Sequence, residues 1–75
     1  MKDNRIKKLG FNIKIERLRQ NYSQLQLANL ANISIESVQK IESGKQTPSV
    51  FMFFDIINAL NIPVETVYHD MDKSE

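Results

Sequence analysis

The chain contains no cysteine, which excludes both a disulfide framework and a thiolate metal site. It also has no run of about eighteen apolar residues, the length that a transmembrane helix needs. Its basic N-terminus, MKDNRIKKLG, is not followed by the apolar segment of a signal peptide. We therefore expect no export signal, no membrane span and a location in the cytoplasm.

Residues that carry catalytic chemistry are scarce. The one histidine, His69, lies in a polar C-terminal tail, and the chain has neither a glycine-rich phosphate loop nor acids or histidines at metal-binding spacing. We interpret His69 as a surface residue at the end of the last helix. The expectation is a protein that is not an enzyme and that holds no cofactor and no metal.

The net charge of +1 hides an uneven distribution of charge along the chain. Residues 1–45 contain nine Lys or Arg and four acidic residues, a balance of +5, whereas residues 46–75 contain one Lys and five acidic residues, a balance of −4. Such asymmetry suits a module that presents its basic end to phosphates. The alternative is a drift of surface charges in a domain that binds nothing acidic.

A chain of 75 residues forms one domain whose core is marginal unless a partner subunit supports it, so size alone favours a dimer. There is no internal repeat, no low-complexity tract and no alternating strand pattern. Turn signals divide the chain into helical stretches, which predicts an all-α, compact five-helix bundle. The expected helices lie near residues 9–20, 24–31, 35–43, 48–60 and 64–68, with flexible ends at 1–5 and 70–75.

The segment from Gln24 to Lys45 has the spacing of two short helices that meet at a corner. Ser23 can cap the first of them by accepting from the amide of Gln26, whose side chain can return the bond. Asn32 tolerates the positive φ that a tight corner needs. Ser34 can then cap the second helix, and Gly44 ends it as a left-handed cap.

The two faces of that second helix differ. Val38 and Ile41 are three residues apart and are expected to face inward. This leaves the outer side to Ile35, Glu36, Gln39 and Lys40.

The flanking helices are less regular. In the first helix, Leu9 and Ile13 form one apolar edge, and Phe11, Ile15, Leu18 and Tyr22 form a second edge roughly opposite. Helix four is expected to start with Thr47 as its cap and Pro48 in its first position. Its expected core face is Val50, Phe53, Ile57 and Leu60, and the last helix should turn Val64, Val67 and Tyr68 inward.

From about Leu9 to Tyr68 the chain resembles the helix-turn-helix family of phage repressors, Cro-like proteins and XRE-type bacterial regulators, whose domains are of the lambda-repressor type. The matching residues are Ser23, Gln24, Leu27, Ala28, Ala31, Ile33, Ser34, Val38, Ile41, Glu42, Gly44, Lys45, Pro48, Ser49, Ala59 and Leu60. The ordered set is specific, although Glu16 stands where many relatives have Leu.

The resemblance implies residues that read DNA bases. Lys40 could donate to guanine, Glu36 could accept from cytosine, and Ile35 could pack on a thymine methyl group. Glu36 also suits the first turn of any helix through the macrodipole, which is the alternative for that residue. The implied base-reading residues are Ser34, Ile35, Glu36, Gln39 and Lys40.

The resemblance also implies phosphate contacts and an internal ion pair. Gln24, Ser43, Lys45 and Gln46 match positions that contact the DNA backbone on the two sides of the groove, and their alternative is an ordinary solvated turn or loop. Arg17 and Glu42 match positions that in some relatives form a buried pair. Arg17 could instead lie on the surface and contact phosphate.

Helix four has more apolar residues than one small core can cover. We therefore expect a dimer contact formed by Phe51, Phe54, Asn61, Ile62 and Val64. The predicted function is a sequence-specific transcriptional regulator, a repressor that binds double-stranded DNA at a palindromic operator as a homodimer. The alternative is a protein-interaction module of the antitoxin or anti-regulator type, which binds a protein partner through this apolar surface.

Overall fold

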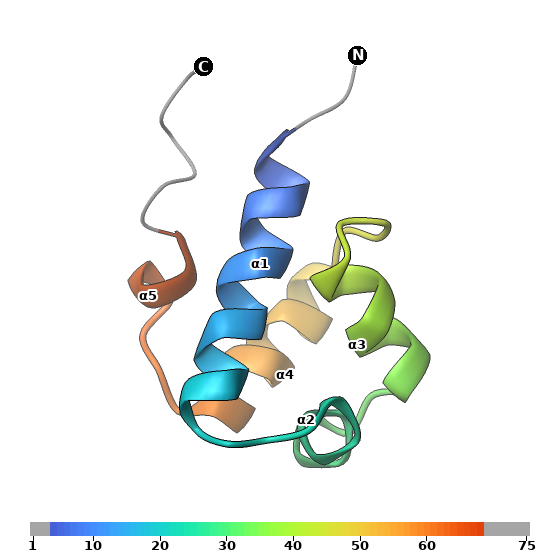
Figure 1. Ribbon diagram of the computed structural model, residues 1–75, viewed down its shortest axis with the longest axis vertical. Helices are drawn as coiled ribbons and strands as arrows, with labels where there is room; N and C mark the ends of the chain where they lie inside the picture. Colours follow the sequence, from blue (N-terminus) through green and yellow to red (C-terminus); the bar gives the residue numbers. More distant parts are fainter. Residues whose placement is uncertain (1–3, 69–75) are drawn as a thin grey trace.

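The computed structural model describes residues 4–68, which form five helices and no strand. The all-α, five-helix prediction is confirmed. In Figure 1, α1 runs vertically through the centre, α5 lies on one side of it, α3 lies on the other, and α4 passes behind. The helices are α1 (Asn4–Arg19), α2 (Gln24–Ala31), α3 (Ile35–Glu42), α4 (Val50–Leu60) and α5 (Glu65–Tyr68).

The core is formed where these helices face one another: α1 packs on α3 and α5, and α2 packs on α3 and α4. The largest side chains that are fully buried include Ile13 of α1, Leu27 of α2, Ile41 of α3 and Ile56 of α4. All four are aliphatic, so the contacts between these helices are mainly apolar.

The first four helices end in the same way, with one residue in the left-handed conformation. These residues are Asn21 (φ 63°), Asn32 (φ 59°), Gly44 (φ 78°) and Asn61 (φ 55°). In each case the N–H of the next residue donates to the carbonyl five residues back, over 2.8 to 3.4 Å, as in the Schellman motif. Tyr22, Ile33 and Ile62, which follow the three asparagines, pack on the core. Each asparagine therefore ends a helix and directs the next apolar side chain inward.

The first helix begins earlier than expected, at Asn4 instead of near Leu9, so it includes Asn4 and Arg5, which were expected to lie in a flexible end. Ile6 within the added turn is half-buried. The edge containing Ile13 faces the core, while Phe11 and Leu18 of the opposite edge are exposed. Residues 1–3 and the tail from His69 to residue 75 lie outside the described part of the chain.

The start of helix four also differs from the prediction. Its cap is Ser49, whose side chain accepts the Met52 N–H over 3.1 Å, and not Thr47. The prediction was wrong because two good capping residues flank Pro48, and the serine caps the helix. Pro48 thus precedes the helix instead of forming its first turn.

The core faces of α4 and α5 are rotated from the expected ones. Val50 is 65% exposed, while Ile56, which was not expected in the core, is 1% exposed. Tyr68 is 55% exposed instead of inward, although Val67 is fully buried. Val50 and Tyr68 both line an open groove between α1, α4 and α5, which the helical period alone could not reveal.

Within residues 4–68 no helix combines the length and the apolar character that crossing a bilayer requires. The same residues include no cluster of His, Cys, Asp or Glu side chains that could hold a metal ion.

Candidate nucleic-acid interface

The corner begins with the capped start of α2. The Ser23 hydroxyl accepts the Gln26 N–H over 3.0 Å, and the Gln26 side chain accepts the Ser23 N–H over 2.7 Å. This reciprocal pair is the expected capping box. It fixes where α2 starts and the direction in which its first turn points.

Asn32 makes the turn between α2 and α3. Its backbone is left-handed, and the chain leaves it through Ser34, whose hydroxyl accepts the Ser37 N–H over 3.1 Å. In Figure 1, α2 is seen end-on while α3 rises beside it, so their axes cross steeply. The two helices therefore form a corner and not one continuous rod.

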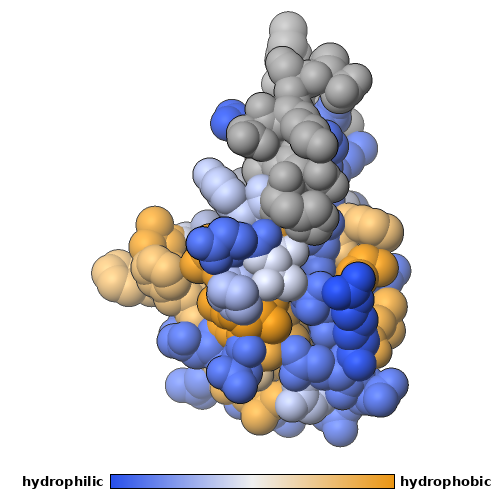
Figure 2. Space-filling model, turned by 90° about the vertical axis from the view of Figure 1, so that its left-hand side faces the viewer, coloured by the Kyte–Doolittle hydropathy of each residue, from blue (hydrophilic) through white to orange (hydrophobic). Residues whose placement is uncertain are grey.

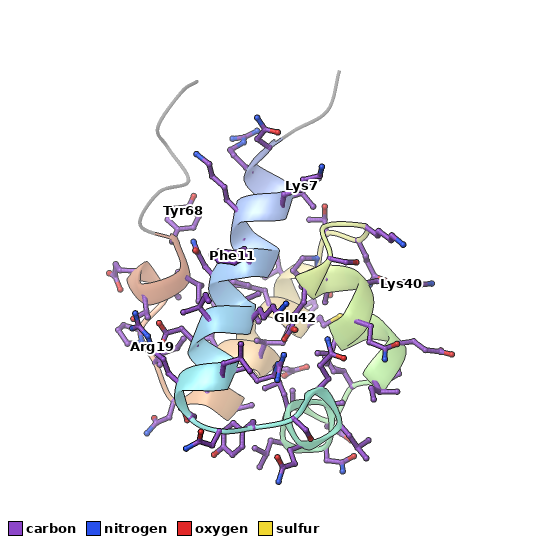
Figure 3. The ribbon with its side chains drawn as sticks, viewed as in Figure 1. Lys7, Phe11, Arg19, Lys40, Glu42 and Tyr68 are labelled. Carbon is purple, nitrogen blue, oxygen red and sulfur yellow. The ribbon has the colours of Figure 1, made fainter. Side chains whose placement is uncertain are left out.

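Buried residues set the rotation of α3 about its own axis. Val38 and Ile41 are each 1% exposed and anchor one side of the helix in the core. The five residues expected to read bases are all exposed, one as the N-cap of α3 and four on the helix itself: Ser34, Ile35, Glu36, Gln39 and Lys40. Figure 3 shows Lys40 pointing outward from α3, away from the rest of the molecule.

The structure brings Arg17 and Glu42 together between α1 and the end of α3. Arg17 donates from Nε to Oε2 of Glu42 over 2.7 Å and from Nη2 to Oε1 over 3.0 Å. The two side chains are 7% and 3% exposed. A third Arg17 bond reaches the Tyr22 carbonyl over 2.6 Å, so this pair ties α1 and its terminal turn to the end of α3.

Gln24 has a partner that sequence reasoning missed. Its Nε2 donates to Oε1 of Glu42 over 3.1 Å, so the side-chain amide is held against the buried ion pair. The Gln24 and Leu25 N–H groups have no partner among the hydrogen bonds of residues 4–68, as expected for the first turn of a helix. The start of α2 therefore offers a phosphate these two backbone N–H groups and the second hydrogen of the Gln24 side-chain amide.

The loop after α3 contains the other expected phosphate contacts. Lys45 is exposed and Gln46 is half-buried. Ser43 is exposed, but its hydroxyl already donates to the Lys40 carbonyl over 3.1 Å. Of the three side chains, Lys45 therefore has the charge and the freedom that an anion contact needs.

Gly10 controls how closely α1 approaches α3. A Cβ atom added at this glycine would overlap the Ile41 carbonyl oxygen. Only glycine permits this contact, which places Arg17 within reach of Glu42. Sequence reasoning missed Gly10 because its requirement comes from a residue 31 positions further along the chain.

Glu16 is another charged residue on the inner side of α1, where it is 8% exposed. Its carboxylate accepts from Arg19 over 3.0 Å. The salt bridge to an exposed arginine lets Glu16 occupy this position without an unpaired charge.

Apolar side chains gather on the outer side of α4. Phe51 is 81% exposed and Phe54 is 49% exposed, and the helical repeat places exposed Asn58 and Asn61 on the same side. Ile62 and Val64, also expected at a dimer contact, are half-buried against the core. Figure 2 shows hydrophobic residues projecting from the side of the molecule on which α4 lies.

Next to this face is a groove of about 260 Å³ lined by Leu9, Val50, Phe53, Phe54 and Tyr68, together with Thr47 and Pro48. It continues the apolar surface of α4 towards α1 and α5. The apolar surface and the outer side of α3 are thus parts of different helices.

A family model described as "Helix-turn-helix" matches residues 13–67, which is most of the chain. No curated protein sequence matches the chain.

Solved structures share the fold. The chain is similar to the restriction-modification controller protein C.AhdI from Aeromonas hydrophila, with 24% identity, a TM-score of 0.80, and coverage of 83% of this chain and 94% of that chain. It is similar to the clp gene regulator ClgR from C. glutamicum, with 19% identity, a TM-score of 0.84, and coverage of 89% and 86%. The restriction-modification controller C.Esp1396I, solved as a tetramer with its natural 35 base-pair operator, has 20% identity, a TM-score of 0.83, and coverage of 93% and 92%.

Proposed function

The chain belongs to the XRE-type helix-turn-helix family of DNA-binding transcriptional regulators, and we propose that it is a repressor that binds a palindromic operator as a homodimer. The observation that carries this proposal is the exposure of α3 and its N-cap. All five expected base-reading side chains are exposed, while Val38 and Ile41 hold the inner side of the helix in the core. A helix presented in this way fits the major groove.

Base reading would rely on three chemically different side chains of α3. Lys40 donates to guanine, Glu36 accepts from the amino group of cytosine, and Ile35 packs on the methyl group of thymine. Ser34 contributes less, because its hydroxyl already caps the helix and donates to the Ser37 hydroxyl over 3.0 Å.

Phosphate contacts would position α3 from both sides of the groove. On one side, the first N–H groups of α2 point away from the helix and favour an anion. On the other side, Lys45 supplies a full charge, with Gln46 beside it. These contacts fix the register of the protein on the duplex without reading its sequence.

Dimerisation would use the outer side of α4, with Phe51 and Phe54 as apolar anchors and Asn61, Ile62 and Val64 at the far end. Two copies related by a two-fold axis would present their α3 helices to successive major grooves, about 34 Å apart. The tetrameric C.Esp1396I complex supports an assembly of several copies on DNA. Repression then follows because a bound dimer occludes the promoter, in the cytoplasm where bacterial DNA lies.

Selection of bound sequences from random duplex DNA tests this function directly. The expected result is an enriched palindrome whose half-sites lie about one helical turn apart. Enrichment of a motif without two-fold symmetry would contradict the dimer, and no enrichment at low salt would contradict DNA binding itself.

Lys45→Gln should weaken binding to every sequence by a similar factor. The loss of one phosphate contact lowers the slope of log affinity against log salt by about 0.9. Fluorescence anisotropy with the selected duplex, at a series of salt concentrations, measures that slope. Lys14→Gln is a control, since Lys14 is exposed on α1 and has no assigned contact; an equal fall in both variants would contradict a specific role for Lys45.

The second candidate function is a protein-interaction module that uses the same outer side of α4. The large exposed surface of Phe51 favours it. This function predicts weak binding to DNA with little sequence preference, and loss of partner binding rather than of DNA binding on Phe51→Ser. The same salt titration therefore separates the two candidates.

A further inference from the structure

Lys7 of α1 lies directly against the loop that follows α3. A Cβ atom added to Gly44 would lie 2.7 Å from Cγ, 3.2 Å from Cα and 3.4 Å from Cβ of Lys7. The stem of this lysine therefore crosses the backbone of Gly44, the residue next to Lys45. In Figure 3, Lys7 lies on the side of α1 that faces the loop and α3.

The charged end of Lys7 is available to a partner outside the domain. Lys7 is exposed, and the ion pairs of residues 4–68 join other side chains, Arg17 with Glu42 and Arg19 with Glu16. Packing of the stem on Gly44 restricts where the ammonium group can go, as is common for lysines whose apolar stem is covered.

The contact between Lys7 and Gly44 places two exposed lysines, Lys7 and Lys45, at the same loop. Gly44, which the Lys7 stem contacts, directly precedes Lys45 in the chain, and their Cα atoms are about 3.8 Å apart. Two positive charges at one loop raise the local positive potential and attract an anion. A run of phosphates carries regularly spaced negative charge and can neutralise both ammonium groups at once.

We propose that Lys7 binds the DNA backbone together with Lys45, so that α1 supplies a phosphate contact next to the loop after α3. This inference rests on the proposed function and extends its footprint to a helix outside the helix-turn-helix. It assigns a role to the first turns of α1, which begin at Asn4. Gly44 is required here for two reasons, its left-handed backbone and the space that the Lys7 stem occupies.

The test compares Lys7→Gln with Lys8→Gln by fluorescence anisotropy on the selected duplex. Gln keeps the Cβ and Cγ atoms that contact Gly44 and removes only the charge. Lys8 is the next residue on the same helix but points about 100° away around it, so it is a matched control. We expect the salt slope to fall by about 0.9 for Lys7→Gln and to stay at the wild-type value for Lys8→Gln.

Two further variants separate charge from structure. Lys7→Arg should restore the wild-type slope, because it keeps the charge, and all variants should melt within a few degrees of the wild type. If the slope of Lys7→Gln equals that of the wild type, or if Lys8→Gln lowers it equally, the inference is wrong while the proposed function stands. If the wild type itself shows no salt-dependent binding to DNA, the proposed function is wrong, and the inference that rests on it is wrong as well.

Discussion

At the scale of single residues, the buried pair of Arg17 and Glu42 is where charge and stability are most closely linked. Two ions that are less than a tenth exposed lose most of their hydration, and only their mutual bonds compensate for that loss. The Glu42 carboxylate also accepts from Gln24, and within residues 4–68 every buried side-chain nitrogen or oxygen has a hydrogen-bond partner. The pair is therefore complete, and removal of either member leaves a buried charge.

Arg17→Ala should lower the free energy of unfolding by roughly 3–5 kcal/mol. For 75 residues the whole stability is on the order of 4–11 kcal/mol, so the variant should lose a large part of it. Urea denaturation followed by circular dichroism measures the change. An unchanged midpoint would show that Arg17 acts elsewhere, for example at a phosphate.

The double variant Arg17→Met with Glu42→Leu is the matched control. It removes both charges and replaces them with apolar groups of similar volume, so we expect it to recover most of the lost stability. Recovery would attribute the loss in Arg17→Ala to the stranded carboxylate and not to the missing side-chain volume.

At the scale of the elements, the contact between α1 and α3 depends on the absence of a side chain at Gly10. In an exposed helix Gly→Ala stabilises by about 1 kcal/mol, but here the new Cβ would meet a backbone carbonyl that cannot rotate away. We expect Gly10→Ala to lower the free energy of unfolding by about 1–3 kcal/mol, as measured by thermal or urea denaturation. A stabilising effect would mean that α1 can shift freely on α3.

The left-handed asparagines at the ends of the helices allow a test that touches no proposed contact. Asn21 is exposed with φ 63°, and an alanine in this conformation costs roughly 1–2 kcal/mol. Asn21→Ala should therefore lower the free energy of unfolding by about 1 kcal/mol, whereas Asn21→Gly should leave it equal or higher. Equal loss in both variants would contradict the backbone explanation.

Sequence patterns could predict the helix ends and turns that depend on residues close together in the chain. The capping box at Ser23, the corner at Asn32 and the cap at Ser34 each involve residues within three to five positions of one another, and each is found in the structure. The inward side of α3 is equally local, because Val38 and Ile41 define it. The resemblance implies the pairing of Arg17 with Glu42, which no local pattern contains.

The remaining features depend on contacts between distant segments. The need for glycine at position 10 comes from the Ile41 carbonyl, and the stem of Lys7 is positioned by Gly44. The side chain of Gln24 is held by Glu42. The outward position of Val50 and Tyr68 depends on where neighbouring helices end, which helical periodicity does not describe. The roles of the exposed residues on α3 and α4 stay predictions, because exposure permits contact with DNA or a second copy without requiring it.

At the scale of the whole molecule, the proposed dimer depends on the outer side of α4. Phe51→Ser should convert a dimer into a single 8.7 kDa species in sedimentation at micromolar concentration, because it removes the most exposed apolar anchor. Phe11→Ser is the matched control, since Phe11 is also exposed but lies on α1. A wild type that sediments as one chain, or equal effects of the two substitutions, would contradict the assignment of this face.

The four helix ends closed by bonds between residues five apart have a consequence for how quickly the protein becomes active. Each boundary can form without waiting for distant segments to meet, and chains dominated by such short-range contacts fold in microseconds to milliseconds. Stopped-flow refolding should therefore be complete within the first milliseconds. A newly translated chain would thus be folded almost at once, and folding would not delay the pairing with a second copy that the proposed function requires.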